Sequence, residues 1–172
     1  MNTNDCTVLP MWETWEVQPT TAAVRSTRLS LVHAARSWPV PLSGESLRDV
    51  ELCAAELITN AVEHTGKHCQ VTVQWNGIRL RVEVADASPR LSARNAADDM
   101  ATSGRGLLLV GALAHSWGWY PVEAGKVVWF EVAPDESVMG DARLAALVSV
   151  AQARTQKPGL PLGDKPNVQV VS

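Results

Sequence analysis

Apolar and polar residues alternate in two neighbouring stretches of the chain, residues 69–75 and 78–84. This period of two predicts half-buried β-strands, because successive side chains of a strand point to opposite faces of its sheet. Asn76 and Gly77 lie between the two stretches, and both tolerate the positive φ of a tight turn. We therefore predict a hairpin with a two-residue turn. Its apolar face carries Cys69, Val71, Val73, Trp75, Ile78, Leu80, Val82 and Val84.

The chain before this hairpin predicts one strand and two helices. Residues 11–17 favour a strand, because two tryptophans raise their β-propensity. A first helix is expected over about residues 20–38, from a threonine cap to a pair of prolines. A second is expected over about residues 43–64, from a serine cap to Gly66. Its apolar stripe consists of Leu47, Val50, Ala54, Leu57, Ile58 and Ala61.

The chain after the hairpin predicts a long connection, a helix and two more strands. Residues 87–103 are polar and irregular, and connections of this length are often functional lids. Residues 104–106, Gly-Arg-Gly, open an apolar helix, and residues 117–120 and 126–132 favour a strand pair. This order predicts an α+β two-layer sandwich, in which helices cover one face of a mostly antiparallel sheet.

Length and composition are typical of one domain with tails. The chain has 172 residues, of which 46 % are apolar, enough for a real core. We expect a flexible leader at residues 1–10, a domain at residues 11–133, and a tail at residues 134–172. The tail is expected to be partly helical and then disordered, because it is rich in proline and glycine near its end.

Charge and cysteine content exclude several classes of protein. The net charge of −3 leaves no basic stripe for nucleic acid and no polybasic segment for a membrane surface. The first residues lack the basic region of a signal peptide, and glycines and Pro121 interrupt the longest uncharged run. Three cysteines without a CxxC motif favour reduced thiols, so we expect a cytoplasmic protein.

The second predicted helix carries a row of polar residues. Glu56, Asn60 and His64 follow one another at intervals of four, so they lie along one side. A carboxylate there can act as a base, and an asparagine oxygen suits Mg²⁺. The competing interpretation is a solvated polar face, although asparagine is a poor residue for a helix interior.

Two further motifs stand at separate positions. Asp86 ends the second hairpin strand, where a carboxylate can accept a hydrogen bond from an exocyclic amine such as adenine N6, or simply cap a turn. Gly104-Arg105-Gly106-Leu107 precedes an apolar helix, where glycines permit close approach of a ligand and free N–H groups attract an anion. A flexible hinge before the helix is the alternative.

Taken together, the three motifs resemble the N, G1 and G2 boxes of the gyrase, histidine kinase and chaperone-type (GHKL) ATPase superfamily. The resemblance spans about Trp12 to Val132 and is nearest to the anti-sigma-factor serine/threonine kinase branch. It implies the Bergerat ATP-binding fold, with residues 11–133 as a HATPase-like domain that binds ATP and Mg²⁺. The chain carries no phosphoacceptor-histidine domain, which argues against a histidine kinase.

The resemblance also implies roles for single residues. Glu56 would be the catalytic base, Asn60 the Mg²⁺ ligand and Asp86 the reader of adenine. His64 would either touch the ligand or cap the helix, and we favour the cap. Val127 would replace a threonine that often helps the adenine site. The implied ATP-binding residues are Asn60, Asp86, Ser88, Gly104, Arg105, Gly106 and Leu107, with residues 90–103 as a lid.

The resemblance implies a regulatory protein whose partners are other proteins. One hypothesis is a kinase that phosphorylates an anti-sigma antagonist, sequesters a sigma factor and so controls transcription. A homodimer is one assembly compatible with this hypothesis. The alternative is a module that senses ATP or ADP and switches a partner interaction without phosphotransfer. Direct contact with nucleic acid or with a membrane is expected in neither case.

Overall fold

The computed structural model describes residues 11–88, 105–135, 138 and 169–171, and it confirms the α+β prediction. Strands and helices follow in the expected order, with one additional strand near the end of the chain. The elements are β1 Met11–Val17, α1 Thr21–Ser37, α2 Gly44–Thr65, β2 Cys69–Trp75, β3 Leu80–Asp86, α3 Arg105–Leu113, β4 Ser116–Val122, β5 Gly125–Val132 and β6 Gln169–Val171.

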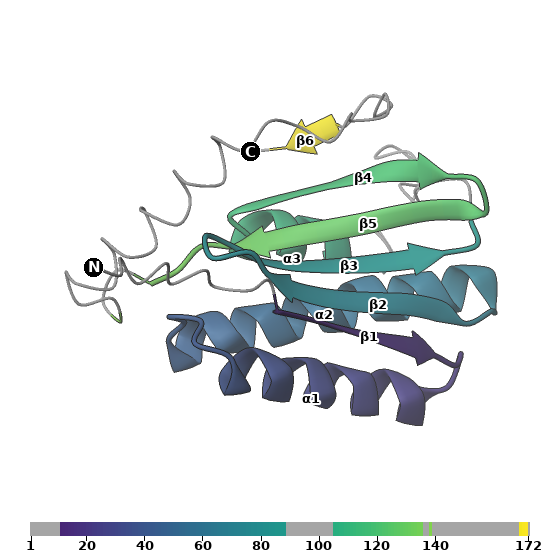
Figure 1. The fold of residues 1–172 in the computed structure, drawn as a ribbon. Helices are drawn as coiled ribbons and strands as arrows, with labels where there is room; N and C mark the ends of the chain where they lie inside the picture. Colours follow the sequence, from purple (N-terminus) through teal and green to yellow (C-terminus); the bar gives the residue numbers. More distant parts are fainter. Residues whose placement is uncertain (1–10, 89–104, 136–137, 139–168, 172) are drawn as a thin grey trace, which may run out of the picture.

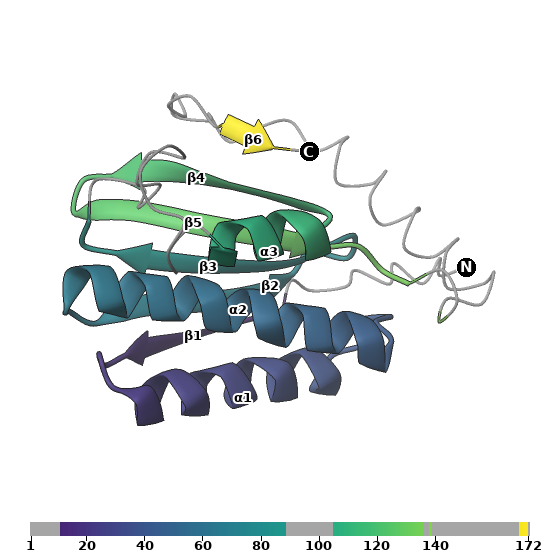
Figure 2. The same cartoon turned by 180° about the vertical axis from the view of Figure 1, so that it is seen from behind.

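The strands form a single antiparallel sheet in the order β1-β2-β3-β5-β4-β6. Helices α1, α2 and α3 lie together on one face of this sheet, as Figures 1 and 2 show from opposite sides. The inward residues of the strands and the apolar stripes of the helices form one buried core. β3 and β5 are neighbours at the centre of the sheet, and α2 contacts both of them.

Local capping explains where the two long helices begin and end. The Thr20 side chain accepts a hydrogen bond from the N–H of Ala23 at the start of α1. Ser43 does the same for Ser46 at the start of α2. Gly66 ends α2 in the left-handed conformation with φ of 61°. The sequence predicted these caps correctly because each depends only on neighbouring residues.

The turn of the β2–β3 hairpin differs from the prediction. Trp75 pairs with Leu80, so the connection holds four residues rather than two. The Asn76 side chain accepts hydrogen bonds from the N–H groups of Ile78 and Arg79, and this local turn lengthens the connection. Ile78 is therefore 41 % exposed instead of facing the core. The connection is two residues longer than predicted. Because side chains alternate between the two faces of a strand, a shift of two leaves the inward face of β3 unchanged.

The packed part of the chain extends beyond residue 133. Asp135 accepts hydrogen bonds from the Ser43 N–H at 2.5 Å and from the Ser46 hydroxyl at 2.7 Å, at the start of α2. Three residues of the tail that was expected to be disordered form β6, which pairs with β4. The expected leader, most of the expected lid and the expected tail helix lie outside the described residues. Among the described helices, none is long and apolar enough to cross a membrane.

Candidate functional site

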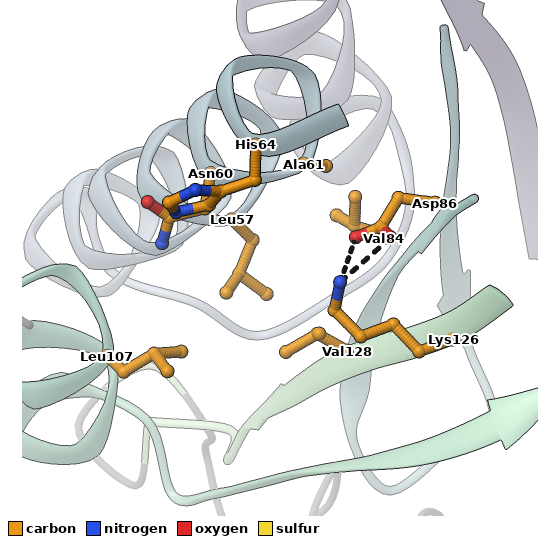
Figure 3. Close-up of a pocket in the computed structure, with 9 residues that line it drawn as sticks. All are labelled: Leu57, Asn60, Ala61, His64, Val84, Asp86, Leu107, Lys126 and Val128. Atoms are coloured by element: carbon orange, nitrogen blue, oxygen red, sulfur yellow. Dashed lines mark hydrogen bonds and ion pairs between the residues drawn. The ribbon is translucent and has the colours of Figure 1, made fainter. Parts of the chain in front are cut away.

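A pocket opens between α2, α3 and the ends of β3 and β5. It brings together residues from all three sequence motifs: Asn60 and His64 from the first, Asp86 from the second and Leu107 from the third (Figure 3). The motifs are far apart in the chain and meet because α2 packs on both β3 and β5, while α3 packs against α2. The lining residues are Leu57, Asn60, Ala61, His64, Val84, Asp86, Leu107, Lys126 and Val128.

Helix α2 supplies the polar edge of this pocket. Asn60 and His64 lie one turn apart and both line the pocket, as the spacing of four predicts. The histidine is exposed, and the end of the helix is capped by Gly66 instead. The expectation that His64 serves as a cap is therefore wrong, and its ring belongs to the pocket edge.

Gly106 brings the start of α3 against the polar side of α2. A Cβ atom at this position would lie 2.6 Å from Oε2 of Glu56 and 3.2 Å from Nδ2 of Asn60. Only glycine permits this approach without displacing the two side chains. Glu56 does not line the pocket itself but lies beside it, half-buried, next to Gly106. The first and third motifs are thus in direct contact.

A buried ion pair closes the inner end of the pocket. Nζ of Lys126 lies 2.8 Å from Oδ1 and 2.7 Å from Oδ2 of Asp86 (Figure 3). Both residues are buried, with exposed fractions of 3 % and 7 %. The Ser88 N–H also donates to Oδ1 of Asp86 at 2.7 Å, and the Ser88 carbonyl oxygen lies 3.5 Å from the lysine nitrogen. The carboxylate is therefore oriented by three donor contacts.

Lys126 holds the position that the sequence assigned to Val127. In the register of β3 with β5, Lys126 lies opposite Asp86, whereas Val127 lies opposite Ala85. Neighbouring side chains of a strand point to opposite faces, so Val127 shares the outer face with Trp129, whose ring contacts the Arg81 guanidinium. The predicted effect of Val127 on the adenine site is therefore wrong, because its side chain faces away from the pocket.

Lys126 is the site residue that sequence reasoning missed. A signal for it was present, since Lys126 is in phase with Val128 and Phe130, which point into the core. A lysine at an inward position of a buried strand needs a charged partner. Finding that partner requires the register of two strands that are 40 residues apart at this pair.

Gly125 allows the ends of β3 and β5 to approach. Its φ is +155°, and a Cβ atom there would lie 1.9 Å from the backbone oxygen of Asp86. No side chain fits in that space, so glycine is required for Lys126 to reach Asp86.

Two buried thiols lie behind the site. Burial, reinforced by the nearby carboxylates of Asp49 and Glu56, raises the pKa of Cys53 to about 12. Burial and the Asp86 carboxylate raise the pKa of Cys69 to about 11. Both thiols therefore stay protonated at neutral pH and are poor nucleophiles and metal ligands. In the described part of the chain, no group of three or more His, Cys, Asp or Glu residues is placed to hold a metal ion.

Two of the predicted binding residues lie at the edge of the described part of the chain. Gly104 lies outside the described residues. Arg105 begins α3, and nothing is described of its side chain. Leu107 lines the pocket.

The arrangement suits a planar ring that carries an anionic group. Leu57, Val84 and Val128 provide apolar walls, and the Asp86–Lys126 pair provides polar atoms at one end. At the other side, the start of α3 offers backbone N–H groups that favour an anion. The Asn60 oxygen beside them is a hard ligand of the kind that Mg²⁺ accepts.

Comparison with known proteins adds one finding. Residues 17–132 match the model of a family described as the histidine kinase-like ATPase domain. The match covers α1 to β5 and so includes every wall of the pocket. A comparison with curated proteins found no match.

Proposed function

Since the chain belongs to the histidine kinase-like ATPase domain family, we propose that it binds Mg²⁺-ATP and phosphorylates a serine or threonine hydroxyl of a partner protein. Family membership indicates the ATP binding, while the phosphotransfer and the partner are our inference. The observation that carries the proposal is the meeting of Asn60, Asp86 and Leu107 in one pocket, with Gly106 against Glu56.

The proposal assigns the parts of ATP to different sides of the pocket. Asp86 would accept a hydrogen bond from the adenine amine, with Leu57 and Val128 against the ring. The start of α3, which Gly106 brings against Glu56 and Asn60, would bind phosphate oxygens through its backbone N–H groups. Asn60 would bind the Mg²⁺ that these oxygens share. The close approach of Gly106 to Glu56 and Asn60 supports this fit, because it brings the N–H groups of α3 beside the polar residues of α2.

Glu56 is the proposed catalytic base. Its Oε2 atom lies 2.6 Å from the position that a Cβ of residue 106 would have, beside the proposed phosphate position. Bound ATP supplies the phosphoryl group that is transferred. Glu56 would accept the proton of the attacking hydroxyl, which contributes about 10²- to 10⁴-fold to the rate in general base catalysis.

The proposed partners are an anti-sigma antagonist that carries the acceptor hydroxyl and a sigma factor that the domain sequesters. This would make the protein a regulator of transcription that acts through proteins. The resemblance of the three motifs to the anti-sigma kinase branch supports these partners.

The proposal is tested by comparing wild type with Glu56→Gln in two assays. We expect Mg²⁺-ATP to bind both proteins with similar affinity, measured by titration calorimetry. Transfer of label from γ-labelled ATP to antagonist proteins encoded near this gene should fall at least about 100-fold in the variant. The matched control is Glu63→Gln, which changes an exposed glutamate of the same helix and should leave both values unchanged.

Each failure has a distinct meaning. Transfer by Glu56→Gln at the wild-type rate would show that Glu56 is not the base. Binding of ATP without transfer by the wild type to any of these proteins would favour the nucleotide-sensing module. If the folded wild type did not bind ATP, both the kinase hypothesis and the nucleotide-sensing hypothesis would fail.

A further inference from the structure

The Asp86–Lys126 pair has a feature that base recognition by Asp86 alone leaves unexplained. Its two side chains are only 2 % and 4 % exposed, yet both line the pocket. Burying an ion pair has a desolvation cost, and an apolar pair of similar volume is often no less stable. A lysine at this place therefore calls for a role beyond stability.

The pair presents a hydrogen-bond acceptor and a donor side by side at the end of an apolar slot. Adenine has the complementary arrangement on its Watson–Crick edge, where the N6 amine donates and the adjacent N1 accepts. Guanine has the reverse order, with O6 as acceptor and N1–H as donor. A carboxylate alone would accept a hydrogen bond from any exocyclic amine, whereas the pair recognises two neighbouring atoms of the base at once.

The contacts leave the lysine free to serve both partners. Its ammonium nitrogen lies within 2.8 Å of both oxygens of Asp86. An ammonium group has three donors and a carboxylate has about four acceptor positions. Lys126 can therefore keep one carboxylate oxygen and turn a second N–H toward a base, while the Ser88 N–H still orients Asp86.

We propose that Lys126 is a specificity-determining residue that donates a hydrogen bond to N1 of adenine while Asp86 accepts one from N6. This inference rests on the proposed ATP binding and adds the atom by which the base is recognised. Lys126 then compensates the buried charge of Asp86 in the empty site and recognises the base in the filled one.

The test compares Mg²⁺-ADP with its 1-deaza analogue, in which a C–H group replaces N1. ADP avoids turnover, and calorimetric titration gives both dissociation constants. We expect the wild type to bind the analogue about tenfold more weakly or worse, because a hydrogen bond to a charged group is lost. Lys126→Met should bind the two nucleotides with equal affinity. The matched control, Lys67→Met at an exposed lysine after α2, should discriminate like the wild type.

The outcomes separate this inference from the proposed function. Equal affinity of the wild type for ADP and the analogue would overturn the role of Lys126 and leave ATP binding intact. Tighter binding of ADP by Lys126→Met would also overturn it, since the lysine would then be a latch that the base displaces. If folded wild type bound no ADP, the proposed function itself would fail. Circular dichroism checks the fold of Lys126→Met, and if that variant is unfolded the wild-type comparison alone decides.

Discussion

At the scale of single residues, the site depends on how charge is buried. Asp86 and Lys126 are the two charged residues that the described part of the chain buries below a tenth of their surface. The other ion pairs of the described residues, such as Arg28–Glu51 with about a third of each side chain exposed, are much more open to water. The buried pair is therefore where a single substitution should have the largest electrostatic effect.

Replacing one member of the buried pair should lower the free energy of unfolding more than replacing both members. We expect Lys126→Met to lower the free energy of unfolding by about 3–5 kcal/mol, because Asp86 is left buried without its partner. The double variant Asp86→Leu/Lys126→Met should lose less than Lys126→Met alone, since no charge remains. Urea unfolding measures both values.

The control for this comparison is Arg28→Met, which breaks a more exposed pair and should cost no more than about 1 kcal/mol. If Lys126→Met were as stable as the wild type, the pair would not be the buried interaction described above.

At the scale of elements, two glycine positions differ in whether they have space for a side chain. Gly125 at the start of β5 has no room for a Cβ atom, while Gly44 at the start of α2 has nothing within 4 Å of that position. The difference arises because Gly125 touches the backbone of another strand. Tertiary packing therefore requires glycine at position 125, whereas the glycine at position 44 can be replaced by another helix residue.

Alanine at each glycine tests this difference. We expect Gly125→Ala to lose at least about 2 kcal/mol of stability and to weaken nucleotide binding, because β3 and β5 must separate beside Asp86. Gly44→Ala should be neutral or stabilising by up to about 1 kcal/mol. Thermal melting and Mg²⁺-ADP titration of both variants provide the measurement, and equal effects would contradict the proposed role of the close approach.

Another contact between elements should depend on pH. Burial alone raises the pKa of Asp135, but hydrogen bonds from the Ser43 N–H and the Ser46 hydroxyl lower it overall, below its ordinary value of about 4. A carboxyl group whose pKa is lower in the folded state than in the unfolded state stabilises the protein at pH values above its unfolded-state pKa. That stabilisation is lost as the pH falls through the folded value.

We therefore expect Asp135→Asn to be less stable than the wild type at pH 7, with the difference shrinking below about pH 4. Urea midpoints at several pH values measure this difference. Glu13→Gln, at an exposed strand position, is the control and should show no comparable trend. A difference that stays constant with pH would show that the charge of Asp135 does not matter for the docking.

At the scale of the whole molecule, one bound ligand should connect three segments that are distant in the chain. Asn60, Asp86 and Leu107 come from α2, β3 and α3. A ligand that contacts all three binds only the folded state, and so it raises the free energy of unfolding. At a concentration of 100 times Kd, the stabilisation is about 2.7 kcal/mol. For a domain of this size, the melting temperature should rise by about 5–10 °C.

Mg²⁺-ATP should produce this rise in the wild type. Asn60→Ala should show a smaller rise at the same nucleotide concentration, since the proposed Mg²⁺ ligand is lost. Differential scanning fluorimetry with and without EDTA measures the part that depends on the metal. An equal rise in both proteins would remove Asn60 from the proposed site.

Much of the fold was predictable because it depends on local patterns. The caps at Thr20, Ser43 and Gly66 follow from neighbouring residues, and the alternation around Val71 and Val82 sets which face of each strand is buried. The three motifs could be recognised as candidates for the same reason. The length of the hairpin turn was not predictable, because Asn76 selected a longer turn without changing the buried face.

By itself, the sequence determined the order of the elements, the buried faces and the residue types available for chemistry. These follow from periodicity and from the conformational preferences of individual residues, which act over a few positions. Only the tertiary structure decided that Lys126 rather than Val127 faces Asp86, and that Gly106 lies against Glu56. Such pairings depend on the register and packing of distant segments, which no local pattern specifies.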